Sequence, residues 1–515
     1  MSDPFYITTA IHYPNGRPHI GHAYEMIAAD AIARFQRQAG RDVFFQTGTD
    51  EHGLKMVKTA RDRGVEVRDL ADEMSGYFHE MSGILNISCD RFIRTVEPQH
   101  YAASQAIWTA MRDAGDLYLD RYEGWYSVRD EAFYEEKELT DGEGGVRLSP
   151  QGTPVEWTAE ETWFFRLSKY QQPLLDFYTA NPDFIQPESR RNEVLRFVEG
   201  GLTDLSVSRT SFDWGVPVPD SPGHVMYVWV DALTNYLTGA GYPEAPNRYW
   251  PAALHLIGKD IVRFHAVYWP AFLMSANLPL PHKVFGHGFL LNRGEKMSKS
   301  TGNVVDPIKL AELYGVDALR YFLLRDISFG QDGTFSDEAI VTRANSDLAN
   351  SFGNLAQRTL SFIAKNLEGA LPHDGRGDPA DDALLTSVGE AIDGYRTAFA
   401  DLALGQALEA WMRGVFACNQ YIDVQAPWAL RKTDPERMHA VLGTLVRAIR
   451  DLAIAIEPVV PASAATLLTL LGQAGRGHDA LGDYGWYVEQ RSAGFRLAPP
   501  VPIFPRLTLA EVEPA

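Results

Sequence analysis

The feature that most limits the possible folds is a strand–turn–helix–strand pattern that occurs twice, far apart in the chain. In the first copy, residues 5–47, β-rich apolar runs flank a helical stretch at 21–38. In the second copy, residues 255–289, they flank a helical stretch at 261–276. Strand, helix and strand at this spacing are typical of a βαβ unit in a parallel sheet. The sequence therefore predicts an α/β fold with one Rossmann-type parallel sheet that an insertion splits in two.

The stretch between the two copies has another composition, with short aromatic strands and a Gly- and Pro-rich segment, and from about residue 340 the chain reads as helical. A Pro-rich apolar tail, 499–515, is expected to pack back on the body. We expect five units, which are a first Rossmann half at 1–115, an inserted mixed α/β connective domain at 116–222, a second Rossmann half at 223–292, a loop region at 293–345, and an α-helical bundle with its tail at 346–515.

Composition indicates a cytosolic globular enzyme. Of the 515 residues 45% are hydrophobic and 22% charged, which is ordinary for a protein with a large core. We find no signal peptide and no apolar run of the roughly 18 residues that a membrane helix needs. Two isolated cysteines, Cys89 and Cys418, do not make a disulfide framework. The formal net charge of −20 argues against a protein that coats nucleic acid, although a locally basic RNA site stays compatible with it.

The first chemical motif is His19-Ile20-Gly21-His22, which follows the first strand and opens the first helix. Two imidazoles at i and i+3 share one face of a helix N-terminus, where anions are favoured. Gly21 lets another group approach the backbone closely. This arrangement suits a nucleotide phosphate that gathers charge in a transition state. By itself the motif is equally compatible with two surface histidines near a helix cap.

The second motif is Lys296-Met297-Ser298-Lys299-Ser300, which has glycines on both sides. Lysine acts as a point charge on phosphate, and the glycines permit the loop to close over a ligand. A solvated loop without function would have a similar composition.

Together, in this order and in this strand–helix context, the two motifs resemble those of class I aminoacyl-tRNA synthetases. The resemblance implies that the amino-acid carboxylate attacks the α-phosphate of ATP, and that the acyl group then moves to the terminal adenosine of tRNA. His19, His22, Lys296 and Lys299 would be the catalytic residues. The implied ATP-binding residues are Pro14, Asn15, His19, Gly21, His22, Glu25, Gly258, Asp260, Gly288, Phe289, Lys296, Met297, Ser298, Lys299 and Ser300, with Mg²⁺ on the ATP phosphates.

Aromatic residues near the predicted strand ends bear on the choice of amino acid. Ile261, His265 and Trp269 recur at i, i+4 and i+8, which is also the pattern of a helix face packed in a core. The stretches 10–16, 48–53 and 258–269 resemble methionyl-tRNA synthetases. That resemblance implies that Asp50 holds the substrate ammonium and that aromatic rings pack on the thioether. The implied L-methionine-binding residues are Ala10, Ile11, Tyr13, Asp50, Trp229, Ala232, Leu233, Tyr236, Ile261, His265 and Trp269.

Polar and aromatic residues of the helical region point to RNA. Asn350, Asn354 and Arg358 fall at i, i+4 and i+8, and Pro427-Trp428 follows farther on. Asparagine and arginine read base edges, and an exposed tryptophan stacks an unpaired base. A solvated helix face with a core tryptophan is the alternative. Both elements match anticodon-reading positions of methionyl-tRNA synthetases, which implies tRNA(Met) with its CAU anticodon as partner, the 293–345 region as the KMSKS loop and stem contact, and 346–515 as the anticodon-binding domain.

Other members of the wider class are less compatible with these residues. A cysteine enzyme needs metal-ligating cysteines at its pocket, and the branched-chain enzymes are far longer. A non-catalytic RNA-binding paralogue is expected to lose one of the two phosphate motifs, and a small-molecule nucleotidyltransferase is expected to lack the helical region. The chain carries no appended C-terminal dimerisation domain of the kind some relatives have, so a monomer is expected.

The insert departs from relatives that carry zinc knuckles. Tyr126-Ser127-Val128-Arg129-Asp130 stands where the first cysteine pair would be, and residues 101–223 contain neither cysteine nor histidine. Structural zinc sites are built from Cys and His. We predict that the purified protein holds no structural zinc and keeps its fold in chelator. Stoichiometric zinc in an elemental analysis, or unfolding by EDTA, would contradict this prediction.

Overall fold

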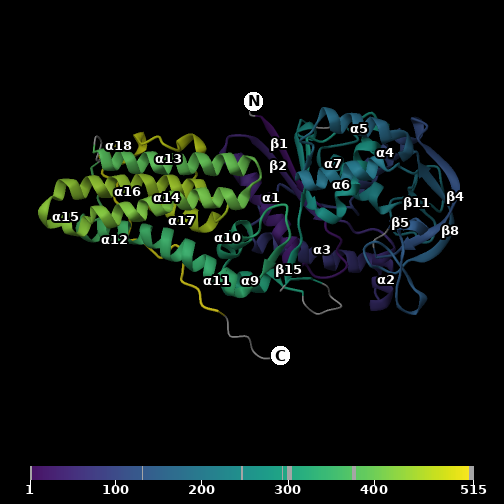
Figure 1. Cartoon of the computed structure of the whole chain (residues 1–515), viewed down its shortest axis with the longest axis horizontal. Coiled ribbons are helices and arrows are strands. Elements are labelled where there is room, and N and C mark those ends of the chain that lie inside the picture. The colour runs from purple at the N-terminus through teal and green to yellow at the C-terminus, as the bar shows by residue number, and fades with distance from the viewer. Residues whose placement is uncertain are drawn as a thin grey trace.

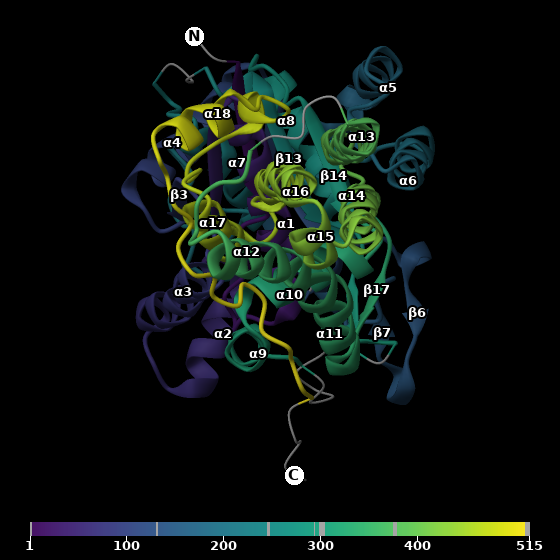
Figure 2. The same ribbon diagram turned by 90° about the vertical axis from the view of Figure 1, so that its left-hand side faces the viewer.

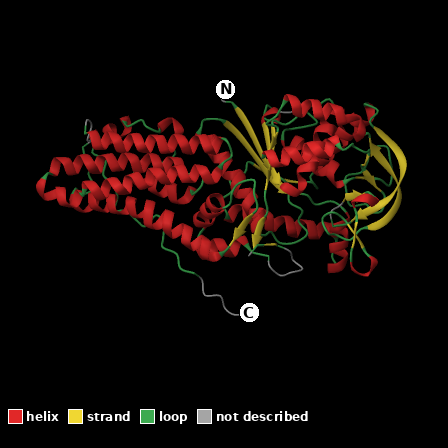
Figure 3. Cartoon of the chain, in the orientation of Figure 1, coloured by secondary structure: helices red, strands yellow, loops and turns green. Residues whose placement is uncertain are grey.

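The computed structural model describes residues 3–129, 132–244, 248–292, 294–297, 304–373 and 378–509. A parallel sheet lies near the middle of an elongated molecule, with a helical bundle on one side and a strand-rich insert on the other (Figure 1). Colouring by secondary structure separates the same three parts (Figure 3). The α/β class with a split parallel sheet, predicted from the sequence, is confirmed.

The central sheet has the strand order β3-β2-β1-β13-β14-β9, and all its pairings are parallel. Its strands are β1 (Pro4–Thr9), β2 (Asp42–Thr49), β3 (Arg91–Arg94), β9 (Ile185–Gln186), β13 (Ala253–Gly258) and β14 (Lys283–His287). Tyr6 of β1 pairs with Phe44 of β2 on one side and with Ala253 of β13 on the other. The two halves of the pattern therefore meet at β1.

The insert is built on an antiparallel sheet of order β10-β8-β4-β5. Its strands and the short pairs beside it are β4 (Leu117–Ser127), β5 (Ala132–Tyr134), β6 (Thr140–Asp141), β7 (Arg147–Leu148), β8 (Glu156–Phe165), β10 (Leu205–Ser206), β11 (Ser208–Arg209) and β12 (Val225–Met226). Strand β9 lies within the range expected for the insert, yet it pairs with β14 as an edge of the central sheet. The unit boundaries stay a prediction.

Helices of the first three units cover the sheet and insert. They are α1 (Ile20–Gln38), α2 (Leu54–Arg63), α3 (Val67–Ile84), α4 (Pro98–Asp113), α5 (Gln171–Ala180), α6 (Glu188–Glu199), α7 (Val228–Gly239) and α8 (Trp269–Ser275). Helix α1 is buried at Ile20 and from Ala23 to Ala33, and its many alanines allow it to lie close to the strands.

The single α-helix predicted over 261–276 is wrong. The segment Phe264–Tyr268 is π-helical, and α8 starts only at Trp269. Pro270 has no N–H for the carbonyl four residues earlier, at Ala266, and the Tyr178 hydroxyl donates to that carbonyl instead. The proline and this tyrosine, which comes from α5, account for the change of helix type.

The C-terminal half is helical, and in Figure 2 the ends of its long helices face the viewer. It begins with a small sheet of β15 (Leu290–Asn292), β16 (Glu295–Lys296) and β17 (Gly333–Phe335). The helices are α9 (Pro307–Tyr314), α10 (Val316–Asp326), α11 (Asp337–Arg343), α12 (Asn354–Asn366), α13 (Pro379–Ala400), α14 (Leu404–Gln425), α15 (Pro427–Thr433), α16 (Pro435–Ile456), α17 (Pro461–Leu470) and α18 (Gly485–Ser492). The tail returns as expected, because Leu507 and the Asn345 side chain exchange two hydrogen bonds of 2.9 and 2.8 Å.

A buried arginine joins the catalytic half to the helical half. Arg320 of α10 donates to Asp30 of α1 at 2.6 Å, and neither side chain is exposed to solvent. The same guanidinium donates to the carbonyls of Leu85, Pro458 and Val459. Burial raises the pKa of Asp30, but Arg320 and Arg34 outweigh that effect and hold it below its ordinary value. One side chain thus links α1, the end of α3 and the turn between α16 and α17.

We predict that Arg320→Met destabilises the protein by about 3–5 kcal/mol, because it leaves a buried carboxylate without its partner. The measurement is urea unfolding followed by tryptophan fluorescence. Arg68→Met is the matched control, since Arg68 and Asp72 form an exposed pair at 3.1 Å, and its loss should cost about 0–1 kcal/mol. Equal midpoints for the two variants would contradict the assignment.

Candidate active site and anticodon site

Several of the predicted substrate-binding residues lie at one edge of the central sheet. The carboxyl ends of β1, β2, β13 and β14 lead into Ala10, Asp50, Lys259 and Gly288, and helix α1 starts beside them. In open parallel sheets this edge is where ligands bind. Residues of the two distant sequence patterns are brought together here because β1 pairs with both β2 and β13.

The His-Ile-Gly-His motif forms the N-terminal cap of α1. Nδ1 of His19 accepts from the Gly21 N–H at 3.1 Å, and Nδ1 of His22 accepts from the His19 N–H at 3.0 Å. The two rings stack with centroids 3.8 Å apart. Because both Nδ1 atoms accept, each neutral ring carries its proton on Nε2. The cap thus presents two N–H donors at a helix N-terminus, which suits a phosphate.

Gly21 is required for this cap by its lack of a side chain. A Cβ at position 21 would lie 2.9 Å from Cε1 of His19. The sequence indicated close approach at this glycine, and the structure identifies the neighbour as the capping imidazole itself.

Glu25, which is also a predicted ATP-binding residue, holds strand ends in place. It is 6% exposed, and its two oxygens accept from the Ala10 N–H at 2.9 Å and from Nε2 of His287 at 2.8 Å. Nδ1 of His287 lies 2.8 Å from the Gly288 carbonyl, so both ring nitrogens donate. Burial lowers the pKa of His287, but the bond and charge of Glu25 raise it above its ordinary value. This ion pair ties α1 to the ends of β1 and β14.

In the second half of the sheet, the residues that follow β13 and β14 are linked to each other through Asp332. Lys259 reaches Asp332 at 2.7 Å and lies 4.6 Å from the ring centre of Phe289. Asp332 also accepts from the Phe289 N–H at 2.8 Å. A Cβ on Gly288 would lie 2.1 Å from the Gln331 carbonyl carbon, so only glycine fits there. Asp332 was missed by the sequence reasoning, because nothing in its surface loop distinguishes it from other exposed aspartates.

The predicted amino-acid pocket is a chain of aromatic and imidazole groups. Nδ1 of His265 lies 2.9 Å from the Ile261 carbonyl and must donate to it, so Nε2 accepts from the Tyr236 hydroxyl at 2.7 Å. Burial lowers the pKa of His265 to about 4, which keeps the ring neutral. Trp229 stacks on Phe264 at 3.9 Å, and Trp269 lies 6.3 Å from Tyr236. Phe264 was missed, since only the π-turn brings it onto Trp229.

Asp50 and Tyr13 lie in the loops that follow β2 and β1, respectively. Asp50 is 7% exposed, and its N–H donates to the His12 carbonyl at 2.9 Å. Tyr13 donates to the His52 carbonyl at 2.9 Å and accepts from the Met56 N–H. The loop after β1, which carries the predicted lining tyrosine, is thus bonded to the loop after β2, which carries the predicted ammonium-binding residue. The remaining predicted residues Ala10, Ala232 and Leu233 are buried, whereas Ile11 and Ile261 are half-buried.

The flanks of the second motif approach the first. Ser298, Lys299 and Ser300 lie outside the described residues, and of Lys296 only the backbone is described, in β16. Met297 packs partly against the core. On the other flank, the Val305 carbonyl accepts from the Ile20 N–H at 3.0 Å. The segment that follows the lysine motif is therefore hydrogen-bonded to Ile20, the first residue of helix α1. Of the other predicted ATP residues, Pro14 is buried, Asn15 half-buried and Asp260 exposed.

The predicted RNA residues lie in the helical half. The polar stripe crosses a change of helix type, because Asn350 is in a π-helical segment, Ala344–Gly353, whereas Asn354 and Arg358 are in α12. The prediction of one regular helix is therefore wrong here. Asn350, Asn354 and Trp428 are exposed. Arg358 lies over the Trp428 ring at 5.2 Å and pairs with Asp423 at 2.8 Å.

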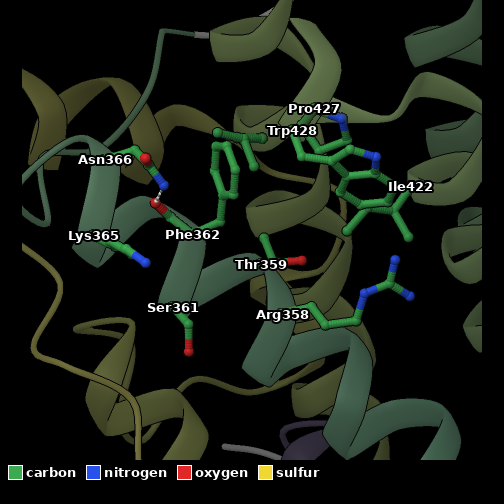
Figure 4. A pocket seen from close by; sticks show the side chains of 10 residues that line it. Arg358, Thr359, Ser361, Phe362, Lys365, Asn366, Ile422, Pro427 and Trp428 are labelled. Carbon is green, nitrogen blue, oxygen red and sulfur yellow. Dashed lines mark hydrogen bonds between the residues drawn. The ribbon is translucent and has the colours of Figure 1, made fainter. Parts of the chain in front are cut away.

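A cavity of about 290 Å³ opens beside this pair. Figure 4 shows the ring of Trp428 above the Arg358 guanidinium, with Phe362 across the cavity and Lys365 and Asn366 on its far side. Buried Pro427 starts α15, and the preceding Ala426 has a φ of 44°. This sharp turn presents Trp428 to solvent.

A family model described as "tRNA synthetases class I (M)" matches residues 5–360, and one described as "Anticodon binding domain of methionyl tRNA ligase" matches residues 371–514. The chain belongs to the methionyl-tRNA synthetase family. The resemblance identified from the sequence is confirmed.

Curated and solved relatives agree with this family over the whole length. The chain is 56% identical to the methionine–tRNA ligase of Brucella suis over 512 residues, which is 99% of both chains. It is 57% identical to that of Mycobacterium tuberculosis over 514 residues, or 98% of both. The Mycobacterium tuberculosis methionyl-tRNA synthetase in complex with methionyl-adenylate superposes with a TM-score of 0.94 at 56% identity, covering 98% of this chain and 100% of that one.

Two negative observations apply to the described part of this synthetase-family chain. Its residues contain no group of three or more His, Cys, Asp and Glu side chains arranged to hold a metal ion. None of its helices in that part combines the length and apolarity needed to cross a bilayer.

We predict that Gly21→Ala lowers the turnover of the family's pyrophosphate–ATP exchange about 100-fold, because displacing a capping imidazole by about 1 Å misplaces its donor. Gly76→Ala is the matched control, since position 76 is an exposed helical glycine with no neighbour within 4 Å of an added Cβ. Both variants should fold. Equal activity of the two would show that the His19 geometry is not needed.

Proposed function

We propose that this chain is a methionine–tRNA ligase, which joins L-methionine and ATP into methionyl-adenylate and pyrophosphate. It then transfers methionine to the terminal adenosine of tRNA(Met), for initiation and elongation of translation. The observation that carries the proposal is that the phosphate-type cap of α1 lies at the same sheet edge as the strand ends that lead into Ala10 and Asp50, and that Glu25 of α1 accepts from the Ala10 N–H at 2.9 Å. ATP and an amino acid held there would meet with their reacting groups adjacent.

No protein nucleophile is needed for this chemistry. The substrate carboxylate attacks the α-phosphate, so the enzyme contributes positioning and charge stabilisation. The Nε2–H groups of His19 and His22 would donate to the phosphates at the N-terminus of α1. Lys296 and Lys299 would neutralise the departing pyrophosphate. Mg²⁺ would enter with the ATP phosphates, because the described side chains offer no metal cluster of their own.

The aromatic pocket supports methionine as the amino acid. Trp229, Tyr236 and Trp269 present ring faces and edges, against which a polarizable thioether packs well. The carboxylate of Asp50 would hold the ammonium group. Apolar discrimination of one methylene is limited to about 10–200-fold, so homocysteine is the expected near-miss. Any editing of homocysteine would have to occur in this same site.

The helical half would read the CAU anticodon. Trp428 would stack an unpaired base, Arg358 beneath it would contact a base edge or phosphate, and Asn350 and Asn354 would add hydrogen bonds. The cavity of about 290 Å³ beside Trp428 has room for a splayed nucleobase. Recognition by a few stacked bases is compatible with a net charge of −20. We further propose that the enzyme works as a cytoplasmic monomer with a zinc-free insert.

The proposal is tested by methionine-dependent exchange of labelled pyrophosphate into ATP. Exchange should require methionine and proceed far more slowly with leucine. No exchange with methionine, or equal exchange with leucine, would overturn the assignment.

Two variants should separate the two steps. Lys299→Ala should slow pyrophosphate exchange by at least about 100-fold, because a charge that acts on the transition state is lost. Trp428→Ala should leave exchange intact and reduce charging of tRNA(Met) by about 10- to 100-fold, since base stacking contributes roughly 1–3 kcal/mol.

Trp157→Ala serves as the control for the second variant, because Trp157 is also an exposed tryptophan (57%) but lies on the insert. It should change neither reaction. Loss of pyrophosphate exchange in folded Trp428→Ala would contradict the division between the two sites.

A further inference from the structure

A fully buried carboxylate behind the amino-acid pocket is held by two histidines. Asp231 of α7 lies 2.6 Å from Nδ1 of His52 and 2.5 Å from Nε2 of His100. The three side chains are at most 1% exposed. They come from three elements, which are the loop after β2, helix α7 and helix α4. The roles assigned so far to the phosphate cap, the pocket and the RNA site use none of the three.

The protons of this cluster can be assigned from its geometry. A carboxylate only accepts, so each histidine donates the hydrogen of the nitrogen that faces Asp231. The other nitrogen of His52 lies 3.0 Å from the Tyr101 hydroxyl. Burial raises the pKa of Asp231, but the two histidines lower it to about 2, and the start of α7 adds a favourable dipole. The cluster thus contains a permanent buried anion.

The His52 side of the cluster and the backbone of Asp231 lead to residues that we assign to methionine, whereas Nδ1 of His100 lies 2.9 Å from the Thr238 hydroxyl, farther along α7. His52 follows Asp50 by two positions, and its carbonyl accepts the Tyr13 hydroxyl at 2.9 Å. Asp231 is followed on α7 by the buried pocket residues Ala232 and Leu233. The phosphate cap at His19 has its own bonds, within α1.

The residue between Asp50 and His52 is bonded to residues outside α7. Glu51 accepts two bonds from Arg94, at 2.7 and 2.6 Å, and its carbonyl accepts from the Trp214 indole at 2.6 Å. Asp50 is thus followed directly by a residue tied to β3, Glu51, and then by a residue tied to α7, His52. Without the bond from His52 to Asp231, the loop would keep its bonds to β3 and to the loop after β1, but this direct link between the loop and α7 would be lost.

We propose that Asp231 is a positioning residue for the amino-acid substrate, which holds the Asp50 loop at a fixed distance from α7 through His52, while His100 of α4 fixes the same carboxylate from the other side. The inference rests on the proposed methionine–tRNA ligase activity. This role predicts an effect on methionine binding and none on ATP binding. Methionine is gripped by its ammonium group on the loop and by its side chain against α7, so loss of the Asp231 charge loosens methionine and leaves ATP binding unchanged.

The test is Asp231→Asn, which keeps the shape and removes the charge. In pyrophosphate exchange the KM for methionine should rise about 10- to 100-fold, whereas the KM for ATP should stay within about 2-fold of wild type. Calorimetric titration of the free enzyme with methionine alone should show the same weakening. Unchanged methionine affinity, or an equal rise in both KM values, would overturn the proposal.

Asp451→Asn is the matched control. Asp451 is also a buried carboxylate with several donors, but it lies in α16 of the helical half. It should lower stability without a selective effect on methionine. If Asp231→Asn does not fold, Tyr101→Phe removes only the hydroxyl at Nε2 of His52 and should raise the methionine KM about 3- to 5-fold, and no change would overturn the proposal. Inactive wild type would refute the proposed function, whereas active wild type with unaltered variants refutes only this inference.

Discussion

Helix α1 is buried along most of its length, so its two buried carboxylates, Glu25 and Asp30, take their partners from inside the protein. At its start the His19 and His22 cap faces the sheet edge. In its middle Glu25 binds the ends of β1 and β14, and Asp30 pairs with Arg320. At its end Gln38 donates to the Ile454 carbonyl at 3.0 Å. Each of these bonds fixes another part of the molecule relative to the phosphate cap.

This arrangement explains how one helix can serve two distant sites. The cap is part of the proposed adenylate site, while the far end of the helix contacts α16, a central helix of the half that carries Trp428. Arg320, which pairs with Asp30 of α1, also donates to two carbonyls in the turn between α16 and α17. A tRNA bound at Trp428 therefore meets a body that is rigidly joined to the sheet. Such a junction sets the span between anticodon and active site through packing.

Several parts of this structure could be predicted from the sequence because they depend on local patterns. The runs around residues 5–47 and 255–289 have the periodicity of strand and helix, and parallel pairing follows from their spacing. The helix cap at His19 follows from its place between a strand and an alanine-rich helix. Other parts depend on partners far away in the chain. The π-turn at Phe264–Tyr268 needs the Tyr178 hydroxyl from the insert, and β9 gains its place only by pairing with β14.

The sequence by itself determined the family, the split parallel sheet and most residues of the two predicted sites, because motif residues and apolar periodicity are written in consecutive positions. Only the tertiary structure decided what those residues do to one another. It paired Glu25 with His287, and it brought Asp231 between His52 and His100. The physical reason is that a buried charge must be satisfied by whichever donors the fold brings within about 3 Å, and these come from elements that no local pattern connects.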